Sequence, residues 1–432
     1  MKIKTIKSFE KASILLDRSR YIAPEVYADG KRTSVEKIVA AIVNEVAGKG
    51  DTALLKYTEK FDGVRLKRLR VSPREILDAY KQIDQTLISD LKVAAARIRK
   101  FHIECKDTVC FSFEKDNLGR VIRPLNMVGI YVPGGKAAYP STVLMTAVPA
   151  KVAGVLKIIM VTPPQPDGNI PAATLVAADI AGVDEIFKVG GAQGIAALAY
   201  GTATIPKVDK ICGPGNIFVS TAKRQVYGAV DIDGIQGPSE IIVVADKTSN
   251  PAYCAADLIA QSEHDELATS ILITDSHYLA ENTFKQINRL MVTLSRKDTI
   301  GKALQSGGLI VIIENMEQAI KLVNLFAPEH LMLMMQNAKK YLPRIKNAGC
   351  IFIGKTSPVV LGDYIAGPSH VLPTGGTSRY SSPLGIESFL KITNYAMLNK
   401  QEQNRLGQIV IRLANQEGLD AHANAINIRL KK

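Results

Sequence analysis

Short apolar runs alternate with alanine-rich helical patterns from about residue 120 to residue 354. The runs are KIIMV, EIFKV, EIIVV, SILIT, GLIVII and CIFIG, and segments with helical spacing, such as AATLVAADIAG and GIAALAYG, lie between them. Continuous apolar strands of this kind are typical of parallel sheets with helices on both faces. The pattern therefore predicts doubly wound, parallel α/β structure.

Helical patterns flank this region on both sides. The segments SVEKIVAAIVNEVAGKGDTALLKYTEKFD and SPREILDAYKQIDQTLISDLKVAAARIRKFH each begin at a serine, Ser34 and Ser72, in the position of an N-cap. After residue 383 the pattern is helical again and has no strand signal. We therefore expect a separate C-terminal helical piece.

Proline and glycine clusters divide the chain. VPGGKAAYP at 132–140 and GIQGP at 234–238 bracket a segment that could be one α/β domain inserted into another. We expect two incomplete Rossmann-like domains, the first over 27–130 and 238–381 and the second over 131–237, with an N-terminal extension over 1–26 and a helical piece over 382–432. The likeness between KIIMV…AATLVAADI and EIIVV…YCAADLIAQ fits a duplication, although any two α/β units could look as similar.

Composition narrows the class of protein. The chain has 432 residues, of which 47% are hydrophobic and 22% charged, so it can bury a large core. Its net charge of +13 could attract phosphate-bearing ligands, either a dinucleotide or a nucleic acid. The densest basic run, at 65–70, contains no aromatic residue that could stack on bases. It is more typical of a solvated strand face.

The cysteines and the longest apolar stretch indicate where in the cell the protein is expected. The five cysteines include no CxxC pair, which argues against both a disulfide framework and a thiolate zinc site. Prolines and lysines interrupt the longest apolar stretch, at 143–161, and the start lacks the features of a signal peptide. We expect a cytoplasmic protein without a membrane span.

Four of the six histidines lie near carboxylates in the sequence: His264, His330, His370 and His422. Gln261 and His264 are three residues apart at the end of a helical pattern, so their side chains share one face. Zinc accepts imidazole and carboxylate ligands, which makes His264, Asp363 and His422 suitable partners. Spacing alone favours a carboxylate such as Glu263 over the amide of Gln261, and a polar helix end without metal remains an alternative.

Glu329 and His330 follow the point where a helical pattern breaks at Pro328. Adjacent acid and base groups suit proton transfer. Oxidation of an alcohol needs a base for the hydroxyl proton, and oxidation onward to an acid needs a group that activates water. A surface turn would explain the pair equally well at this point.

The sequence has no GxGxxG fingerprint. VGGAQGIAALAYG and CGPGN nevertheless place glycines between a strand and a helix, where helix N-terminal N–H groups could meet a phosphate or where the chain simply turns. Tyr131 follows a strand and could stack on a ring or fill the core. Cys212 and Cys254 lie in apolar settings that are more typical of core residues than of nucleophiles.

Several long segments together resemble the histidinol dehydrogenase family, from about residue 25 to the C-terminus. They are GIYVPGGKAAYPSTVLMTAVPAKVAGV, VGGAQGIAALAYGT, GPGN, GPSE, AQSEHDELA, APEHL, GDYIAGPSHVLPTGGTSRYSSPL and EGLDAHANAINIR. The resemblance implies oxidation of L-histidinol, through its aldehyde, to L-histidine, with two NAD molecules reduced. This reaction ends histidine biosynthesis.

The resemblance also implies roles for individual residues. Zinc, one ion per subunit, would be bound by Gln261, His264, Asp363 and His422. Family members are homodimers in which the last of these ligands comes from the partner chain, so the piece over 382–432 would be exchanged between subunits. Glu329 would activate water and His330 would shuttle protons.

The substrate and cofactor sites follow from the same resemblance. The residues in contact with substrate would be Ser239, Gln261, His264, His330, Asp363, His370, Glu417 and His422. The residues that line the NAD site would be Tyr131, Gln193 and Asn216.

Two alternatives are open. A related zinc- and NAD-dependent enzyme could oxidise another polar alcohol, such as a sulfonated propanediol, but Glu417 suits a cationic amino alcohol, whereas a sulfonate favours arginine. A non-catalytic protein could use the positive charge to bind NAD or nucleic acid, but the presence of Glu329, His330 and all four expected ligands argues against it. We expect neither a nucleic-acid partner nor a membrane partner.

Overall fold

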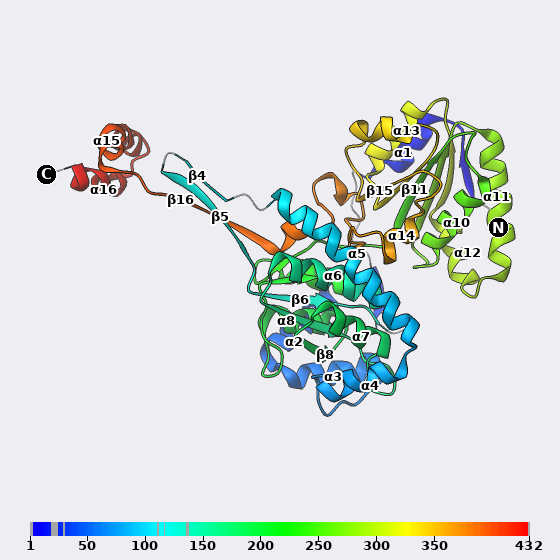
Figure 1. Ribbon diagram of the computed structural model, residues 1–432, viewed down its shortest axis with the longest axis horizontal. Helices are drawn as coiled ribbons and strands as arrows, with labels where there is room; N and C mark the ends of the chain where they lie inside the picture. Colours follow the sequence, from blue (N-terminus) through cyan, green and yellow to red (C-terminus); the bar gives the residue numbers. More distant parts are fainter. Residues whose placement is uncertain are drawn as a thin grey trace.

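The computed structural model describes residues 3–18, 25–28, 31–109, 112–115, 117–134 and 138–430. Two parallel sheets dominate it (Figure 1). The larger sheet has the order β1-β13-β12-β11-β14-β15 and is parallel throughout. Its strands are β1 (Lys4–Ile6), β11 (Glu240–Ala245), β12 (Thr269–Thr274), β13 (Gly308–Ile312), β14 (His330–Met334) and β15 (Cys350–Ile353). The predicted doubly wound α/β class is confirmed.

Helices cover both faces of this six-stranded sheet. They are α1 (Phe9–Leu16), α10 (Pro251–Ser262), α11 (His277–Leu290), α12 (Lys297–Ser306), α13 (Met316–Phe326) and α14 (Val359–Tyr364). Successive residues of β11 point to opposite faces: Ile242 packs in the core with α1 and α13, and Ile241 packs in the core with α10, α11 and α12. Burial on both faces explains why the strand is apolar at every position after Glu240.

The second sheet has the order β10-β9-β6-β7-β8 and is also parallel. Its strands are β6 (Met127–Tyr131), β7 (Lys157–Thr162), β8 (Glu185–Lys188), β9 (Lys210–Cys212) and β10 (Asp231–Ile232). Its crossover helices are α6 (Pro140–Ala153), α7 (Ala172–Ala181), α8 (Gly191–Tyr200) and α9 (Ile217–Val226). The strand order reverses between β6 and β9, and open α/β sheets bind ligands at such a reversal.

Four helices precede this sheet: α2 (Val35–Lys49), α3 (Asp51–Asp62), α4 (Pro73–Gln82) and α5 (Gln85–Val109). Ser34 and Ser72 cap α2 and α4, as predicted. The first helical pattern is divided at Gly50, whose φ of 52° is unfavourable for residues with a side chain.

The helices over 35–109 pack on the five-stranded sheet, which differs from the grouping expected for residues 27–130. Ile98 of α5 lies in one core with Ile130, and Leu54 of α3 lies in another with Ile159. The apolar faces of these helices complete the cover of that sheet. The N-terminal β1, in contrast, pairs with β13 of the six-stranded sheet. The exact domain limits remain a prediction.

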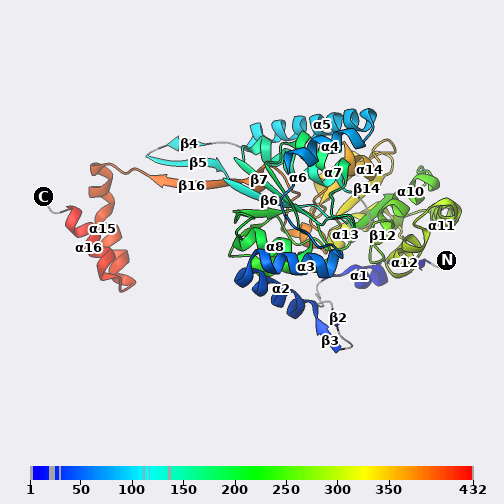
Figure 2. The ribbon, with the colours of Figure 1, turned by 90° about the horizontal axis from the view of Figure 1, so that it is seen from below.

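A long arm leaves the five-stranded sheet. In it, β5 (Leu118–Pro124) pairs antiparallel with both β4 (Phe113–Lys115) and β16 (Leu390–Ala396). The arm ends in two helices, α15 (Lys400–Gln416) and α16 (Asp420–Leu430), which lie far from both sheets (Figure 2). The expectation that no strand follows residue 383 is therefore wrong, because β16 is a strand through its pairing with β5.

The remaining elements are short. A two-stranded sheet joins β2 (Glu25–Ala28) and β3 (Lys31–Ser34), and 3₁₀ helices span Met291–Thr293, Ala338–Arg344, Thr377–Arg379 and Ile386–Phe389. Within the described ranges, no helix combines the length and the apolar character needed to cross a membrane.

Candidate active site

Glu329 and His330 lie at the amino end of β14, inside the six-stranded sheet. The chain leaves α13 through Ala327, which has a left-handed φ of 55°, and enters β14 at His330. Both side chains are buried, with 9% of Glu329 and 5% of His330 exposed. The predicted acid–base pair is therefore a buried pair at a strand end, and the surface-turn alternative is excluded.

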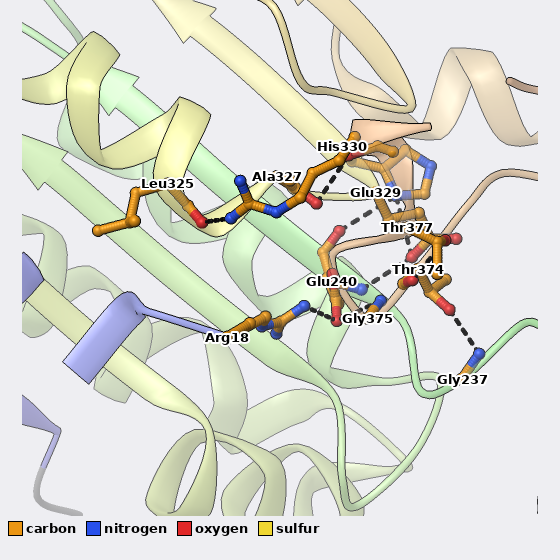
Figure 3. Close-up of polar contacts among 12 residues, drawn as sticks. Arg18, Gly237, Glu240, Leu325, Ala327, Glu329, His330, Thr374, Gly375 and Thr377 are labelled. Atoms are coloured by element: carbon orange, nitrogen blue, oxygen red, sulfur yellow. Dashed lines mark hydrogen bonds and ion pairs between the residues drawn. The ribbon is translucent and has the colours of Figure 1, made fainter. Parts of the chain in front are cut away.

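The backbone of Glu240 contacts both members of this pair (Figure 3). The N–H of Glu240 donates to Glu329 Oε2 at 2.8 Å, and the carbonyl oxygen of Glu240 lies 3.3 Å from His330 Nδ1. Glu329 Oε2 and His330 Nδ1 are 3.5 Å apart. Register explains the arrangement, since Ile241 of β11 pairs with His330 of β14.

The His330 ring lies between two carboxylates. Its Nε2 is 3.8 Å from Asp363 Oδ1, on the side away from Glu329. Burial opposes protonation, but Glu329, Asp363 and the Glu240 carbonyl outweigh it and raise the pKa of His330 to about 9. Such a ring can hold a proton and pass it to a neighbouring oxygen.

The structure brings most of the predicted metal and substrate residues to this end of the sheet. Gln261 is buried in the last turn of α10, and His264 is exposed just beyond it. His370 Nδ1 lies 2.8 Å from the backbone oxygen of Asp363. Burial lowers the pKa of His370, and the nearby rings of His330 and His264 add to that effect. These imidazoles and the Asp363 carboxylate thus share one electrostatic environment.

Ser239 also reaches this region, whereas Glu417 and His422 do not. Ser239 directly precedes β11, and its carbonyl oxygen accepts a hydrogen bond from the Thr269 N–H. Glu417 ends α15 and His422 lies in α16, and both are exposed at the end of the arm. Within one chain, α15 and α16 lie far from the six-stranded sheet that carries Glu329 and His330 (Figure 1).

The metal ligands expected from a single chain could be joined by a further ligand. The Gln261 side chain is buried, and its Nε2 has no hydrogen-bond partner among the residues placed by the structure. No protein contact at that nitrogen fixes the amide, so it can turn its oxygen towards a cation. Across the described ranges, no three His, Cys, Asp or Glu side chains form a group able to hold a metal ion within a single chain.

The predicted cofactor residues lie where the strand order of the five-stranded sheet reverses. Tyr131 ends β6, its ring packs in the core, and its hydroxyl accepts a hydrogen bond from the Gly191 N–H at 3.2 Å. Burial raises the pKa of Tyr131 to about 12. Gln193 is buried in the first turn of α8, while Asn216 is exposed and caps α9 through Oδ1.

The buried cysteines are poor nucleophiles. Cys212 and Cys254 are both fully buried. Burial raises the pKa of Cys254 to about 12 and that of Cys212 well above its usual range. Their thiols therefore stay protonated at neutral pH, in agreement with the core positions predicted for them.

The sequence alone does not identify the residues that hold Glu329 and His330 in place. Glu240 lies in the GPSE segment, which gives it no role of its own, and Arg18 falls in the predicted N-terminal extension. The position of Glu240 beside Ser239 was an available signal. For Arg18 no local signal exists, since 222 positions separate it from Glu240, its ion-pair partner.

Two parallel sheets that carry a buried carboxylate–imidazole pair define an α/β enzyme with acid–base chemistry. The family model of histidinol dehydrogenase matches residues 27–430. A histidinol dehydrogenase of Dehalococcoides mccartyi (strain ATCC BAA-2266 / KCTC 15142 / 195) is 49% identical over 430 residues, which are 99% of this chain and 98% of that protein. One of Clostridium acetobutylicum is 50% identical over 420 residues, which are 96% of this chain and 97% of that protein.

A solved structure also resembles this chain. The crystal structure of histidinol dehydrogenase from Elizabethkingia anophelis matches with a TM-score of 0.91 and 36% identity, covering 99% of this chain and 98% of that one. This chain belongs to the histidinol dehydrogenase family.

Proposed function

We propose that this protein oxidises L-histidinol through its aldehyde to L-histidine, with one NAD reduced in each of two steps. Family membership supports the substrate and the cofactor. The observation that carries the mechanism is the buried pair of Glu329 and His330, contacted by the backbone N–H and the backbone carbonyl oxygen of one residue, Glu240.

The two oxidations need different proton transfers. In the first, the neutral form of His330, which the raised pKa makes the minor form at neutral pH, takes the hydroxyl proton of the alcohol. Hydride would leave the carbon that bears this hydroxyl for NAD, which forms the aldehyde. In the second, Glu329 removes a proton from water as its oxygen adds to the aldehyde carbon. Hydride then leaves the hydrated aldehyde for a second NAD, and the acid forms. Water supplies the added oxygen, and two NADH balance the four electrons.

Zinc would be held by Gln261, His264 and Asp363 of one chain. Their donors are an amide oxygen, an imidazole nitrogen and a carboxylate oxygen. The Gln261 amide, whose nitrogen has no hydrogen-bond partner among the described residues, fits this role. His422 is the proposed fourth ligand. The ion would supply a positive centre that binds and orients the amine and imidazole of the substrate. Ser239, His370 and Glu417 would complete the substrate contacts.

NAD would bind at the carboxyl ends of β6 and β9. The loop after β9 lies tightly against β6, since a Cβ on Gly213 would come within 2.2 Å of the Tyr131 carbonyl oxygen. Asn216 uses Oδ1 to cap α9, which leaves its Nδ2 for a ligand. Tyr131 and Gln193 would support the cofactor from beneath these loops.

The C-terminal helices support a homodimer with shared sites. Leu413 and Ile428 are each 60% exposed on a helix pair too small to have its own core. His422 and Glu417 lie on the same pair, far from the site of their own chain. We propose that this pair packs on a second copy and places both residues in that copy's site.

Turnover and metal content test these proposals together. L-Histidinol should give two NADH per molecule consumed, chelation should abolish turnover, and Zn²⁺ should restore it. One NADH per histidinol would contradict the role of Glu329 in the second step. Full activity in chelated protein shown by elemental analysis to lack metal would contradict the zinc proposal.

A further inference from the structure

Arg18 connects the N-terminal segment to a buried carboxylate beside the acid–base pair. Its Nη1 lies 2.5 Å from Glu240 Oε1 (Figure 3). Its guanidinium carbon lies 3.6 Å from the centroid of the Phe326 ring. The Glu240 side chain is 6% exposed. A carboxylate removed from water in this way needs a counter-charge, and Arg18 supplies it.

Glu240 is the residue whose main chain contacts both Glu329 and His330. Its N–H donates to Glu329 Oε2 at 2.8 Å, and its carbonyl oxygen is 3.3 Å from His330 Nδ1. A displacement of the Glu240 backbone would therefore move or release both groups at once. The pairing of β11 with β12 and β14 holds this backbone, and the side chain of Glu240 attaches it at a further point.

A glycine loop fixes the same carboxylate from the other side. The Gly375 N–H donates to Glu240 Oε1 at 3.1 Å, and Thr374 Oγ1 accepts a hydrogen bond from the Gly237 N–H at 2.5 Å. Gly376 lies against Arg18, since a Cβ there would be 3.6 Å from Arg18 Cδ. The segment that precedes β11 is thus held between Arg18 and this loop.

We propose that Arg18 and Glu240 are positioning residues for the oxidation: their ion pair holds the Glu240 backbone against Glu329 and His330 and so sets the orientation of the acid–base pair. The inference rests on the roles proposed above for Glu329 and His330. Arg18 acts through Glu240, so it should affect the rate of turnover and leave the metal and substrate ligands in place.

The test is steady-state kinetics of Arg18→Met, Arg18→Lys, Glu240→Gln and the double variant, each with zinc content and melting temperature measured. Arg18→Met should lower kcat for L-histidinol by about tenfold to a hundredfold, because small displacements of catalytic groups have effects of that size. The KM for L-histidinol should change by less than about threefold. Arg18→Lys, which keeps the charge, should recover much of the loss.

The double variant tests whether the two residues act as one unit. Glu240→Gln in the Arg18→Met background removes the carboxylate that would otherwise stay buried without a counter-charge. The kcat of the double variant, as a fraction of the wild-type value, should therefore exceed the product of the fractions kept by the two single variants. Should Arg18→Met fail to fold, Glu240→Gln and Arg18→Lys still report on the same contact. Purely multiplicative losses would overturn the inference.

Arg344→Met is the matched control, because Arg344 forms an ion pair with Glu317 at the exposed start of α13. It should keep the wild-type kcat. Equal losses in this control and in Arg18→Met, or an unchanged kcat in Arg18→Met, would overturn the inference. Glu329→Gln distinguishes the proposed function from the positioning role. If Glu329→Gln retains full turnover, the proposed role of Glu329 fails. If it is inactive while Arg18→Met is fully active, only the positioning role fails.

Discussion

His102 of α5 is a buried imidazole that should destabilise the folded protein at low pH. It is 1% exposed, and neither ring nitrogen has a hydrogen-bond partner in the described part of the chain. Burial lowers its pKa from 6.5 to about 4. The unfolded chain therefore takes up a proton near pH 6.5, whereas the folded chain resists protonation down to about pH 4. Stability is lost as the pH falls through this window.

His102→Leu should remove this dependence. The wild-type protein should lose about 2 kcal/mol more stability than the variant between pH 7 and pH 5, because one pKa unit corresponds to about 1.4 kcal/mol. Urea unfolding at the two pH values measures the difference. His277→Leu is the control, since His277 is exposed at the start of α11. Equal pH dependence in all three proteins would contradict the prediction.

Residue types and their order in the chain are enough to predict part of the candidate site. Glu329 and His330 stand out because acid and base are adjacent in the chain. Arg18 and Glu240 do not, since contacts between distant segments leave no periodicity. Asn216 shows a further limit: its Oδ1 caps α9, a role that the sequence analysis does not predict.

At the scale of elements, a fully buried lysine ties α9 to the loop after β9 and to the loop after β10. Lys223 Nζ donates to the Gly213 carbonyl oxygen at 3.0 Å and to Gln236 Oε1 at 2.7 Å, and it forms an ion pair with Asp233. Asp233 Oδ2 accepts a hydrogen bond from the Gly213 N–H at 2.7 Å. The pair therefore fixes the loop that bears Asn216 relative to the linker that leads to β11.

Lys223→Met should be strongly destabilising, by about 3–5 kcal/mol, because it leaves the Asp233 carboxylate buried without a counter-charge. Lys223→Met combined with Asp233→Asn should recover a large part of that loss. The measurement is the free energy of unfolding in urea for both variants. A single variant as stable as the wild type would show that the buried pair contributes little.

Elements are predicted well where the local sequence determines them. Ser34 and Ser72 begin α2 and α4 because side chains of that type accept hydrogen bonds from helix N-terminal N–H groups. The break at Gly50 is not predicted, since a single glycine within an apolar period is tolerated in a helix. The strand β16 is missed because most of its side chains are exposed, so it lacks the apolar run that marks the core strands.

At the scale of the whole molecule, the arm separates residues that the proposed site needs together. The two sheets, their helices and the acid–base pair form the body, and α15 and α16 lie at the far end of the arm (Figure 2). Local patterns predict these helices but not their distance from the body. That distance follows from the pairing of β5 with β16, which no periodicity in the sequence could place.

Mixing two inactive variants tests whether sites are shared. Glu329→Gln disables the body of its own chain, and His422→Ala disables the helix pair that it offers to a partner. In a mixed dimer, one site combines both defects and the other has neither. Random exchange of subunits makes half of the dimers mixed, so activity should rise to about a quarter of the wild-type value. Exchange is started by mild denaturation and dilution, and NADH formation from L-histidinol is followed. If each chain used its own His422, both variants would remain inactive in the mixture, because no exchange could then assemble an intact site.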